Sequence, residues 1–355
     1  SWSDAFTTLQ PALDAARSGD QIWVAEGTYL PTHEFIYGDP RSVSFQMKNN
    51  VAIHGGFDPS GGDIAWEDRD WVNNPAILSG DIGTVGNTSD NCYHVFYHPG
   101  DLTLDSSAII AGFTITGGIA NSYIDPHYNG GGMYNIRSSP TLINIAFTAN
   151  AASQGGGIYN SSYSSPSLTG ITFSSNSASQ GGGIYNSSYS NPTLIDVTFS
   201  ANTAIFGGGG MYNSYSSPSL TDVTFFANSA IDGGGMNDYG SSPILTNVTF
   251  STNLAEYNGG GMFNSNHSNP ILMEVVFFNN SAASGGGMFN ITSWLHLTNV
   301  TFTANTASSG GGVYNSSGSP TLTNVTFFDN LASDVGGGMY NSSYSNSILR
   351  EVTFS

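Results

Sequence analysis

The chain has 355 residues, of which 25 are acidic and 6 are basic, so its formal net charge is −19 at pH 7. This balance excludes a basic track for nucleic acid and an attraction to anionic membrane surfaces. The single cysteine, Cys92, excludes a disulfide framework, and no run of 18 apolar residues predicts a membrane span. The chain begins with Ser1 rather than Met, which is compatible with removal of an export signal.

Residues 1–130 predict an N-terminal cap helix followed by irregular coils. Positions 8–16 place apolar residues on one helical face, with Thr8 as the N-cap and Pro11 in the first turn. A helix here would cover an open first coil, since an uncovered parallel edge recruits other chains. Strands are predicted at 21–25, 43–47, 51–57, 76–78, 94–97 and 108–116, with loops at 58–75 and 81–92.

Residues 131–355 repeat one phrase nine times, at a period of about 26 residues. Each copy contains G-G-G-[M/I/V]-[Y/F]-N, a Ser-rich stretch and roughly P-[T/S]-L-T-[N/D]-V-T-F-x-x-N-[S/T]-A. No copy has the periodicity of a helix, whereas three short strands and three turns use up its length. The predicted fold is all-β: a single right-handed parallel β-helix, continuous through both parts, whose nine coils make a rod roughly 43 Å long.

The repeat also predicts columns of equivalent side chains. One Phe and one Leu per coil are expected to face inward and supply most of the stability. An Asn follows almost every Phe by three residues, and a stacked Asn column forms a ladder in which each amide donates to the next. Asn also tolerates the left-handed backbone of a tight turn. The predicted structural ladder contains Asn150, Asn176, Asn202, Asn228, Asn253, Asn280, Asn305 and Asn330.

Several motifs resemble known families. Ile22-Trp-Val-Ala25, Gly55-Gly-Phe57, Leu78-Ser-Gly-Asp81 and Gly112-Phe-Thr-Ile-Thr-Gly-Gly118 are similar to bacterial exported β-helix proteins of the pectin-lyase-like fold. The glycine motif with F-x-x-N, as at 173–176, resembles the repeats of polymorphic outer membrane proteins, although Gly-Gly-Gly-Met replaces their usual Gly-Gly-Ala. These resemblances imply an extracellular or cell-surface location in a prokaryote, and they imply little about activity because the fold hosts enzymes, adhesins and fibres.

An aromatic residue follows the Met, Ile or Val of most repeats. Strand alternation turns these rings outward, where they could contact glycans or neighbouring rods, unless they pack beneath the turns. A looser second set in the Ser-rich turns adds Tyr163, Tyr189, Tyr215 and Tyr344. The first column, broken at Asn237, contains Tyr134, Tyr159, Tyr185, Tyr212, Phe263, Phe289, Tyr314 and Tyr340.

Asp196 and Asp222 form the best carboxylate pair, because both lie three residues before the repeat Phe and should stack about 5 Å apart. The alternatives are two solvated turn acids, a shared Ca²⁺ and a retaining glycosidase. The sequence predicts no other cofactor.

The motif Asn-x-Ser/Thr, which marks sites of glycan attachment, is frequent. Either the repeat itself requires these residues or glycans are attached to them. The motif occurs at Asn160, Asn186, Asn247, Asn299, Asn315, Asn324 and Asn341.

Three functions remain open. From Ser138 to Leu349 the chain has no Lys or Arg, which weighs against an enzyme that cleaves acidic polysaccharides. The sequence stops within a strand phrase, so it is a fragment, has lost an anchor, or has its end covered by another subunit in a head-to-tail filament. The preferred prediction is a non-enzymatic extracellular fibre or surface protein. The alternatives are a monomeric adhesin that binds polysaccharide along the aromatic column and a glycoside hydrolase.

Overall fold

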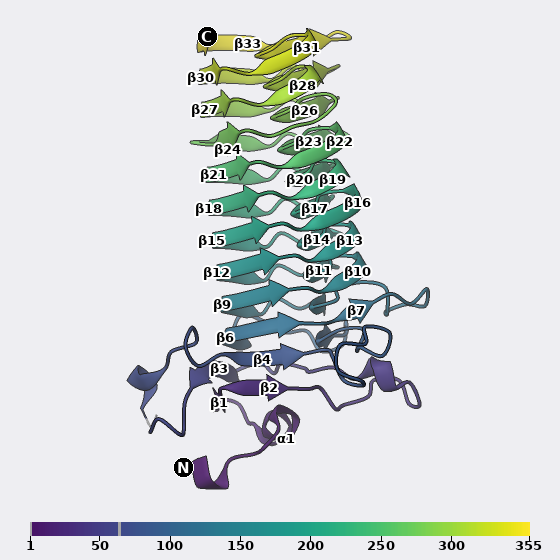
Figure 1. Cartoon of the computed structure of the whole chain (residues 1–355), viewed down its shortest axis with the longest axis vertical. Helices are drawn as coiled ribbons and strands as arrows, with labels where there is room; N and C mark the ends of the chain where they lie inside the picture. Colours follow the sequence, from purple (N-terminus) through teal and green to yellow (C-terminus); the bar gives the residue numbers. More distant parts are fainter. Residues whose placement is uncertain (1, 63–64) are drawn as a thin grey trace.

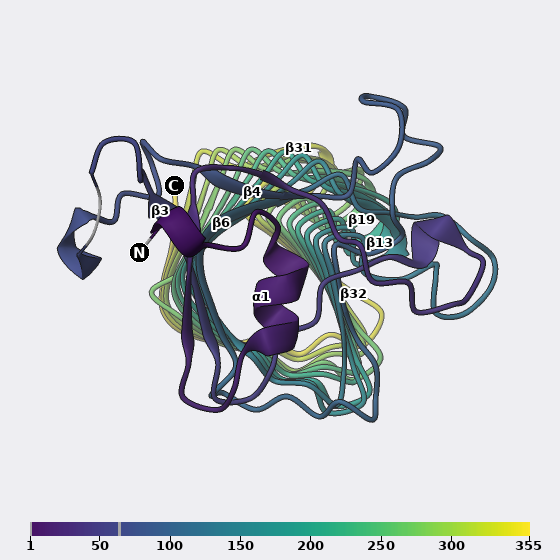
Figure 2. The same cartoon turned by 90° about the horizontal axis from the view of Figure 1, so that it is seen from below.

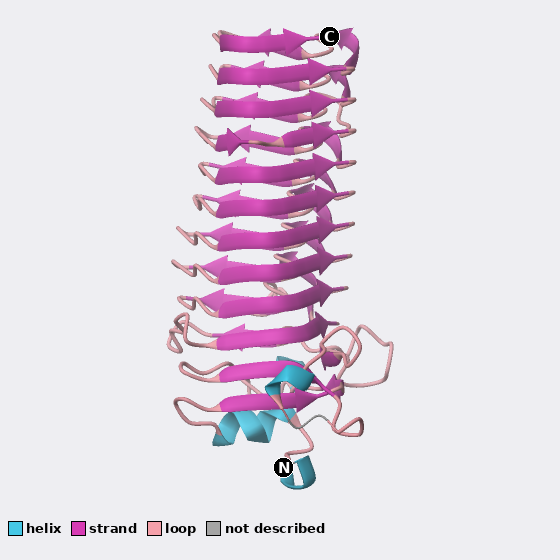
Figure 3. Cartoon of the chain, turned by 90° about the vertical axis from the view of Figure 1, so that its left-hand side faces the viewer, coloured by secondary structure: helices cyan, strands magenta, loops and turns pink. Residues whose placement is uncertain are grey.

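Each repeat of the sequence forms one coil of three strands. The computed structural model describes residues 2–62 and 65–355. In one coil, β12 (Ser167–Ser174), β13 (Ser177–Gln180) and β14 (Ile184–Ser187) follow one another, and each pairs in parallel with its counterparts in adjacent coils. Leu168 lies beside Leu194 and Phe173 beside Phe199. The coils stack into a rod (Figures 1 and 3). The protein is therefore a parallel β-helix repeat protein, as the sequence predicts.

Three long sheets run along the rod. The first contains β1 (Gln21–Ala25), β2 (Gly27–Tyr29), β3 (Ala52–Phe57), β4 (Ala76–Ser79), β6 (Ile109–Thr116), β9 (Thr141–Thr148), β12, β15 (Thr193–Ser200), β18 (Ser219–Phe226), β21 (Ile244–Ser251), β24 (Ile271–Met273), β25 (Val276–Phe278), β27 (His296–Thr303), β30 (Thr321–Phe328) and β33 (Ile348–Phe354).

The second sheet contains β7 (Ile119–Ala120), β10 (Ala151–Gln154), β13, β16 (Thr203–Gly207), β19 (Ser229–Asp232) and β22 (Leu254–Asn258). Isolated bridges at Ser281 and Ser284 continue it to the pair β28 (Thr306–Ser309) and β31 (Leu331–Val335). The third sheet contains β5 (Phe96–His98), β8 (Met133–Ile136), β11 (Ile158–Ser161), β14, β17 (Met211–Ser214), β20 (Met236–Tyr239), β23 (Met262–Ser265), β26 (Met288–Ile291), β29 (Val313–Ser316) and β32 (Met339–Ser342).

The N-terminal helix closes one end of the rod. Helix α1 (Leu9–Ala15) lies across the opening of the first coil (Figure 2), and its Leu9 and Leu13 are buried there. This confirms the predicted cap, although the Thr8 side chain makes no capping hydrogen bond. Three short 3₁₀ helices accompany it: η1 (Trp2–Asp4), η2 (Pro40–Ser42) and η3 (Trp66–Asp68).

The predicted N-terminal strands are found within two residues of their expected bounds, with one exception. The strand predicted at 43–47 is wrong: Val43 and Phe45 make only isolated bridges, to Glu34 and Phe96. This stretch lies at the start of the third sheet and has a neighbouring strand, β5, on one side only. It therefore lacks the continuous hydrogen-bond ladder that would define a strand. Its apolar side chains still face inward, and Phe45 is fully buried.

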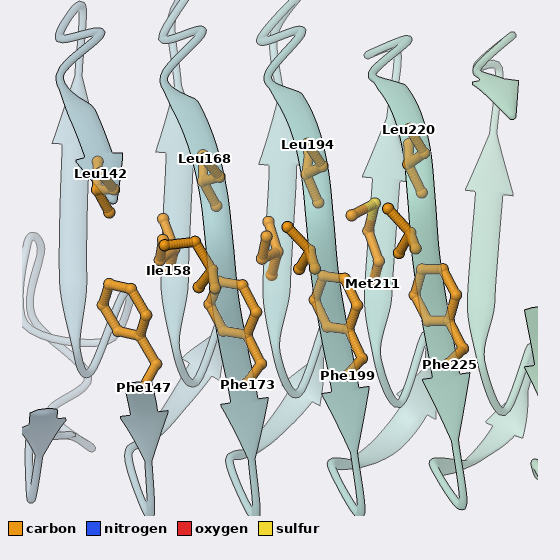
Figure 4. Packing of buried hydrophobic residues seen from close by; sticks show 14 of the residues in the cluster. Leu142, Phe147, Ile158, Leu168, Phe173, Leu194, Phe199, Met211, Leu220 and Phe225 are labelled. Atoms are coloured by element: carbon orange, nitrogen blue, oxygen red, sulfur yellow. The ribbon is translucent and has the colours of Figure 1, made fainter. Parts of the chain in front are cut away.

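The core consists of the predicted columns of Phe and Leu, joined by the Met, Ile or Val that follows each glycine run (Figure 4). Phe147 through Phe327 are buried, and successive rings stack with centroids 4.7–5.1 Å apart. Each fully buried ring contributes on the order of 2–3 kcal/mol. In the last coil, Leu349 and Phe354 are about half exposed (46% and 50%).

The glycine triplet forms the corner between the second and third sheets, where the chain folds tightly back on itself. In one triplet Gly208 has a φ of +66°, which favours glycine. A Cβ on Gly209 would overlap the carbonyl oxygens of Gly234 and Ser229. A Cβ on Gly210 would lie 2.7 Å from the Phe225 ring. The triplet is therefore required by the close approach of backbone and core at this corner.

Candidate functional site

The predicted asparagine column is a hydrogen-bonded ladder inside the rod. The Nδ2 group of Asn202 donates to the Oδ1 of Asn228 in the next coil (3.0 Å) and to the carbonyl oxygen of Phe173 (2.9 Å). The backbone N–H of Asn202 donates to the same Oδ1 (3.0 Å). The bonds from coil to coil continue from Asn150 to Asn330. The column therefore pairs buried polar groups and is a fold element.

The prediction that the ladder Asn residues adopt the left-handed backbone conformation is wrong. The residues with positive φ at this turn are those that directly precede each Asn, such as Ala201 (φ 52°) and Ala227 (φ 53°). The Asn residues themselves do not adopt the left-handed conformation. Asn recurs at this position in each repeat because its side-chain amide supplies both hydrogen-bond donors and an acceptor to buried partners.

A second ladder, which the sequence analysis missed, lies in the third sheet. It begins at His98, whose Nδ1 is 2.7 Å from the Oδ1 of Asn135, and each later amide donates to the next coil at 2.7–2.9 Å. The Asn that follows Tyr or Phe in every glycine motif except one was the available signal. The ladder contains Asn135, Asn160, Asn186, Asn213, Asp238, Asn264, Asn290, Asn315 and Asn341.

Asp238 is the single departure from Asn in this second ladder. Its Oδ1 accepts from Asn213 Nδ2 at 2.7 Å. Its Oδ2 and the Oδ1 of Asn264 in the next coil are buried and have no hydrogen-bond partner. Burial raises the pKa of Asp238 to about 8. A protonated Asp238 can donate to Asn264 as an amide would, so the neutral acid completes the ladder.

The aromatic column is largely covered, which is the packed alternative that the sequence left open. Tyr134, Tyr159, Tyr185 and Phe289 are buried, and Tyr212, Phe263, Tyr314 and Tyr340 are half-buried. The rings point away from the interior of the rod, as alternation requires, but the glycine corner brings the chain back close to them. A Cβ on Gly181, for example, would lie 3.0 Å from the Cβ of Tyr185. At the break in the column, Asn237 Nδ2 donates to the carbonyl oxygen of Asp232, at the end of β19.

Burial also raises the pKa values of tyrosine side chains in this column. It raises the pKa of Tyr185, and it raises the pKa of Tyr212 to about 12. Tyr134, Tyr159 and Tyr185 form an apolar cluster against which Tyr212 packs. The column is thus a second, smaller core, and of the two alternatives that the sequence left open the burial favours packing of the rings over an open glycan or lateral contact.

The structure divides the Asn-x-Ser/Thr positions into two groups. Asn160, Asn186 and Asn315 belong to the second ladder and are fully buried, so their side chains are inaccessible for glycan attachment. Asn247, Asn299 and Asn324 are exposed, and so is Asn341, the last member of the second ladder. Attachment of glycans therefore remains a prediction for these four positions.

Asp196 and Asp222 lie on neighbouring coils, exposed on the outer face of the first sheet. Both have positive φ, 55° and 56°, at a position that the pairing of neighbouring strands skips; Gly170 occupies the same position one coil earlier. Within residues 2–62 and 65–355, no group of three or more His, Cys, Asp or Glu side chains is arranged to hold a metal ion. Asn247 Nδ2 of the next coil donates to Asp222 Oδ1. A calcium site at this pair stays a prediction.

The second, looser set of aromatic residues is exposed. Tyr163, Tyr189, Tyr215 and Tyr344 lie in the turn that follows each third-sheet strand, and 48–101% of each side chain is accessible. All four have positive φ (50–69°). The left-handed conformation costs a non-glycine residue roughly 1–2 kcal/mol, and the cost is not recovered by burial here. Strain of this kind in exposed rings is a reason to look for a binding role.

One comparison with known proteins agrees with the repeat. A model of the Chlamydia polymorphic membrane protein repeat matches residues 170–187, which include Phe173 and Asn176. This confirms the predicted resemblance over that segment. No curated protein matches the sequence. Among solved structures the chain is similar to PfbA, a surface adhesin of Streptococcus pneumoniae, at 13% identity and a TM-score of 0.45, covering 94% of this chain and 89% of that one.

Among the residues that the structure describes, no helix is long and apolar enough to cross a bilayer.

Proposed function

We propose that the protein is a non-enzymatic, adhesin-like rod on the surface of a bacterial cell, which binds an extracellular partner along its side. One observation carries this proposal: the coils pair in register from β6 to β33, so each outward position of the repeat becomes a row along the rod. A row of individually weak, identical contacts binds a multivalent partner with high avidity. The match to a polymorphic membrane protein repeat supports the surface location.

The enzyme alternative depends on Asp196 and Asp222. Both carboxylates are exposed to water on the outer face of the first sheet. The general acid of a glycosidase works in a site that shields it from solvent. The geometry therefore supports binding better than catalysis.

The test uses beads coated with the purified protein through a C-terminal biotin tag. The beads are passed in flow over surfaces of neutral glycans, anionic glycans and extracellular matrix proteins, with albumin-coated beads as the control. We expect retention on at least one surface, and exposure of the protein to protease on intact cells of its source. Retention equal to albumin on every surface, or a protein protected inside the cells, would contradict the proposal.

A head-to-tail fibre is a second candidate. The capped end of the rod carries a groove of about 340 Å³ lined by Trp2, Phe6, Trp23 and Tyr29, and Phe6 is 59% exposed. A second copy of the chain could bury this apolar surface. Electron microscopy over a concentration series tests the idea: filaments that disappear in Phe6→Ser support it, and isolated rods at every concentration contradict it.

A further inference from the structure

Exposed rings lie in or beside the turn that follows the third-sheet strand in six of the coils. Six successive coils contribute one ring each, and we call these six residues the corner row. The side chains of Tyr163 and Tyr189 are 70% and 60% exposed, and that of Trp294 is 43% exposed. The corner row consists of Tyr163, Tyr189, Tyr215, Tyr239, His267 and Trp294.

Neighbouring rings of the corner row touch in pairs. Tyr163 stacks on Tyr189 with centroids 5.7 Å apart, and His267 stacks on Trp294 at 5.5 Å. Tyr215 and Tyr239 meet edge to face at 5.4 Å. Rings that stack along the rod axis present their edges sideways to solvent. These edges are electropositive and attract oxygen atoms, and each Tyr adds a hydroxyl group.

The fold does not require rings at this corner. In the coil of Tyr239 the left-handed position is taken by Gly240, and one coil after Trp294 it is taken by Ser317. Tyr163, Tyr189, Tyr215 and His267 adopt the same left-handed conformation at a steric cost while remaining exposed. Packing therefore gives no reason for this series.

The surroundings of the corner row are polar and lack positive charge. Ser165, Asn191, Ser217, Ser242 and Asn269 are the exposed neighbours, and each side chain accepts a backbone N–H from the next coil. Their remaining hydroxyl and amide groups are available to a ligand. With no Lys or Arg between Ser138 and Leu349 and a net charge of −19, the rod repels polyanions.

We propose that the corner row binds an extended, uncharged polysaccharide that lies parallel to the rod axis. The inference rests on the proposed adhesin-like function and names its ligand class. A chain of similar sugar units matches a row that repeats once per coil, because each unit offers the hydroxyl groups that ring edges, phenols and Ser or Asn side chains bind. Several weak contacts along one polymer add to a useful affinity.

The competing occupant of the row is a second rod. Two copies that met along their corner rows would bring their negative charges together, and this repulsion favours a neutral ligand over self-association. The oligomeric state of the protein separates the two cases.

The experiment compares the full chain with a triple variant, Tyr163→Ser, Tyr189→Ser and Trp294→Ser. A matched control removes three equally exposed rings elsewhere, through Phe206→Ser, Phe226→Ser and Phe278→Ser. Circular dichroism and melting curves establish that both variants fold. Affinity electrophoresis then measures binding to linear β-glucan, mannan and dextran, and to polygalacturonate as the anionic probe.

We expect at least one neutral polymer to retard the native chain, with little change between low and high salt. The triple variant should bind about tenfold more weakly or worse, while the control variant keeps its affinity. Equal binding by the triple variant, preference for polygalacturonate, or no retardation by any neutral polymer would overturn the inference. So would a dimer in sedimentation analysis that the triple variant dissociates. Bead adhesion that survives the triple substitution would leave the adhesin-like function standing without this site.

Discussion

The substitution Asp238→Asn isolates one buried carboxyl group and tests the second ladder. In the native chain a protonated Asp238 can donate to Asn264 and so complete the ladder, whereas the ionised acid leaves Asp238 Oδ2 and Asn264 Oδ1 buried without a donor. An Asn at this position accepts from Asn213 and donates to Asn264 at every pH. The variant therefore repeats the arrangement found in the neighbouring coils.

The sign and size of the effect follow from the pKa. The carboxyl pKa of Asp238 rises from an ordinary value of 3.8 to about 8 on folding. Between these pH values the folded chain holds a proton that the unfolded chain releases, so the free energy of unfolding falls as pH rises from 4 to 8. A shift of roughly four pKa units corresponds to about 5–6 kcal/mol. Above pH 8 the loss is complete, and below pH 4 the group has no effect.

Thermal unfolding of native chain and variant at pH 4.5, 6, 7.5 and 9 provides the assay. With an unfolding entropy of about 2 cal/mol/K per residue, the expected difference in Tm grows from under about 2 °C at pH 4.5 to roughly 7–8 °C at pH 9, with the variant more stable. The control Asp196→Asn removes one acidic side chain from the exposed surface and so separates the effect of net charge from that of the buried carboxyl group. A difference for Asp238→Asn that does not change with pH, or a variant less stable at pH 9, would refute the reasoning.

Three further predictions concern the fold and the acidic pair. Asn228→Leu should lower the unfolding free energy by about 3 kcal/mol or more, because it leaves several buried amide and carbonyl groups of adjacent coils unpaired. An unchanged melting curve would show that the first ladder does not stabilise the fold. Gly209→Ala should prevent close packing at the corner and lower Tm by several degrees, whereas a neutral effect would show that the corner can open. Calcium should raise the Tm of the native chain and leave Asp196→Asn unaffected; the absence of a shift in the native chain would end the calcium hypothesis for Asp196 and Asp222.

The sequence by itself determined the repeating part of the protein. A period of about 26 residues requires that equivalent residues stack, so the columns of Phe and Leu had to form one core and the Asn after each F-x-x had to form a ladder. The cap was also readable, because Leu9 and Leu13 recur on one face of a short segment that nothing else in the repeat resembles. Each of these conclusions depends on local periodicity and on stacking alone.

Only the tertiary structure decided which outward positions reach solvent. Alternation along a strand predicts whether a side chain points into or out of the rod. It does not predict whether a neighbouring segment covers the outward side chains. Tyr159 and Tyr163 are four residues apart, yet the folded-back glycine corner covers the first and the turn exposes the second. The pKa of Asp238 is also decided by the tertiary structure, because it depends on the burial of the carboxyl group and on the hydrogen-bond partners that the folded coils provide.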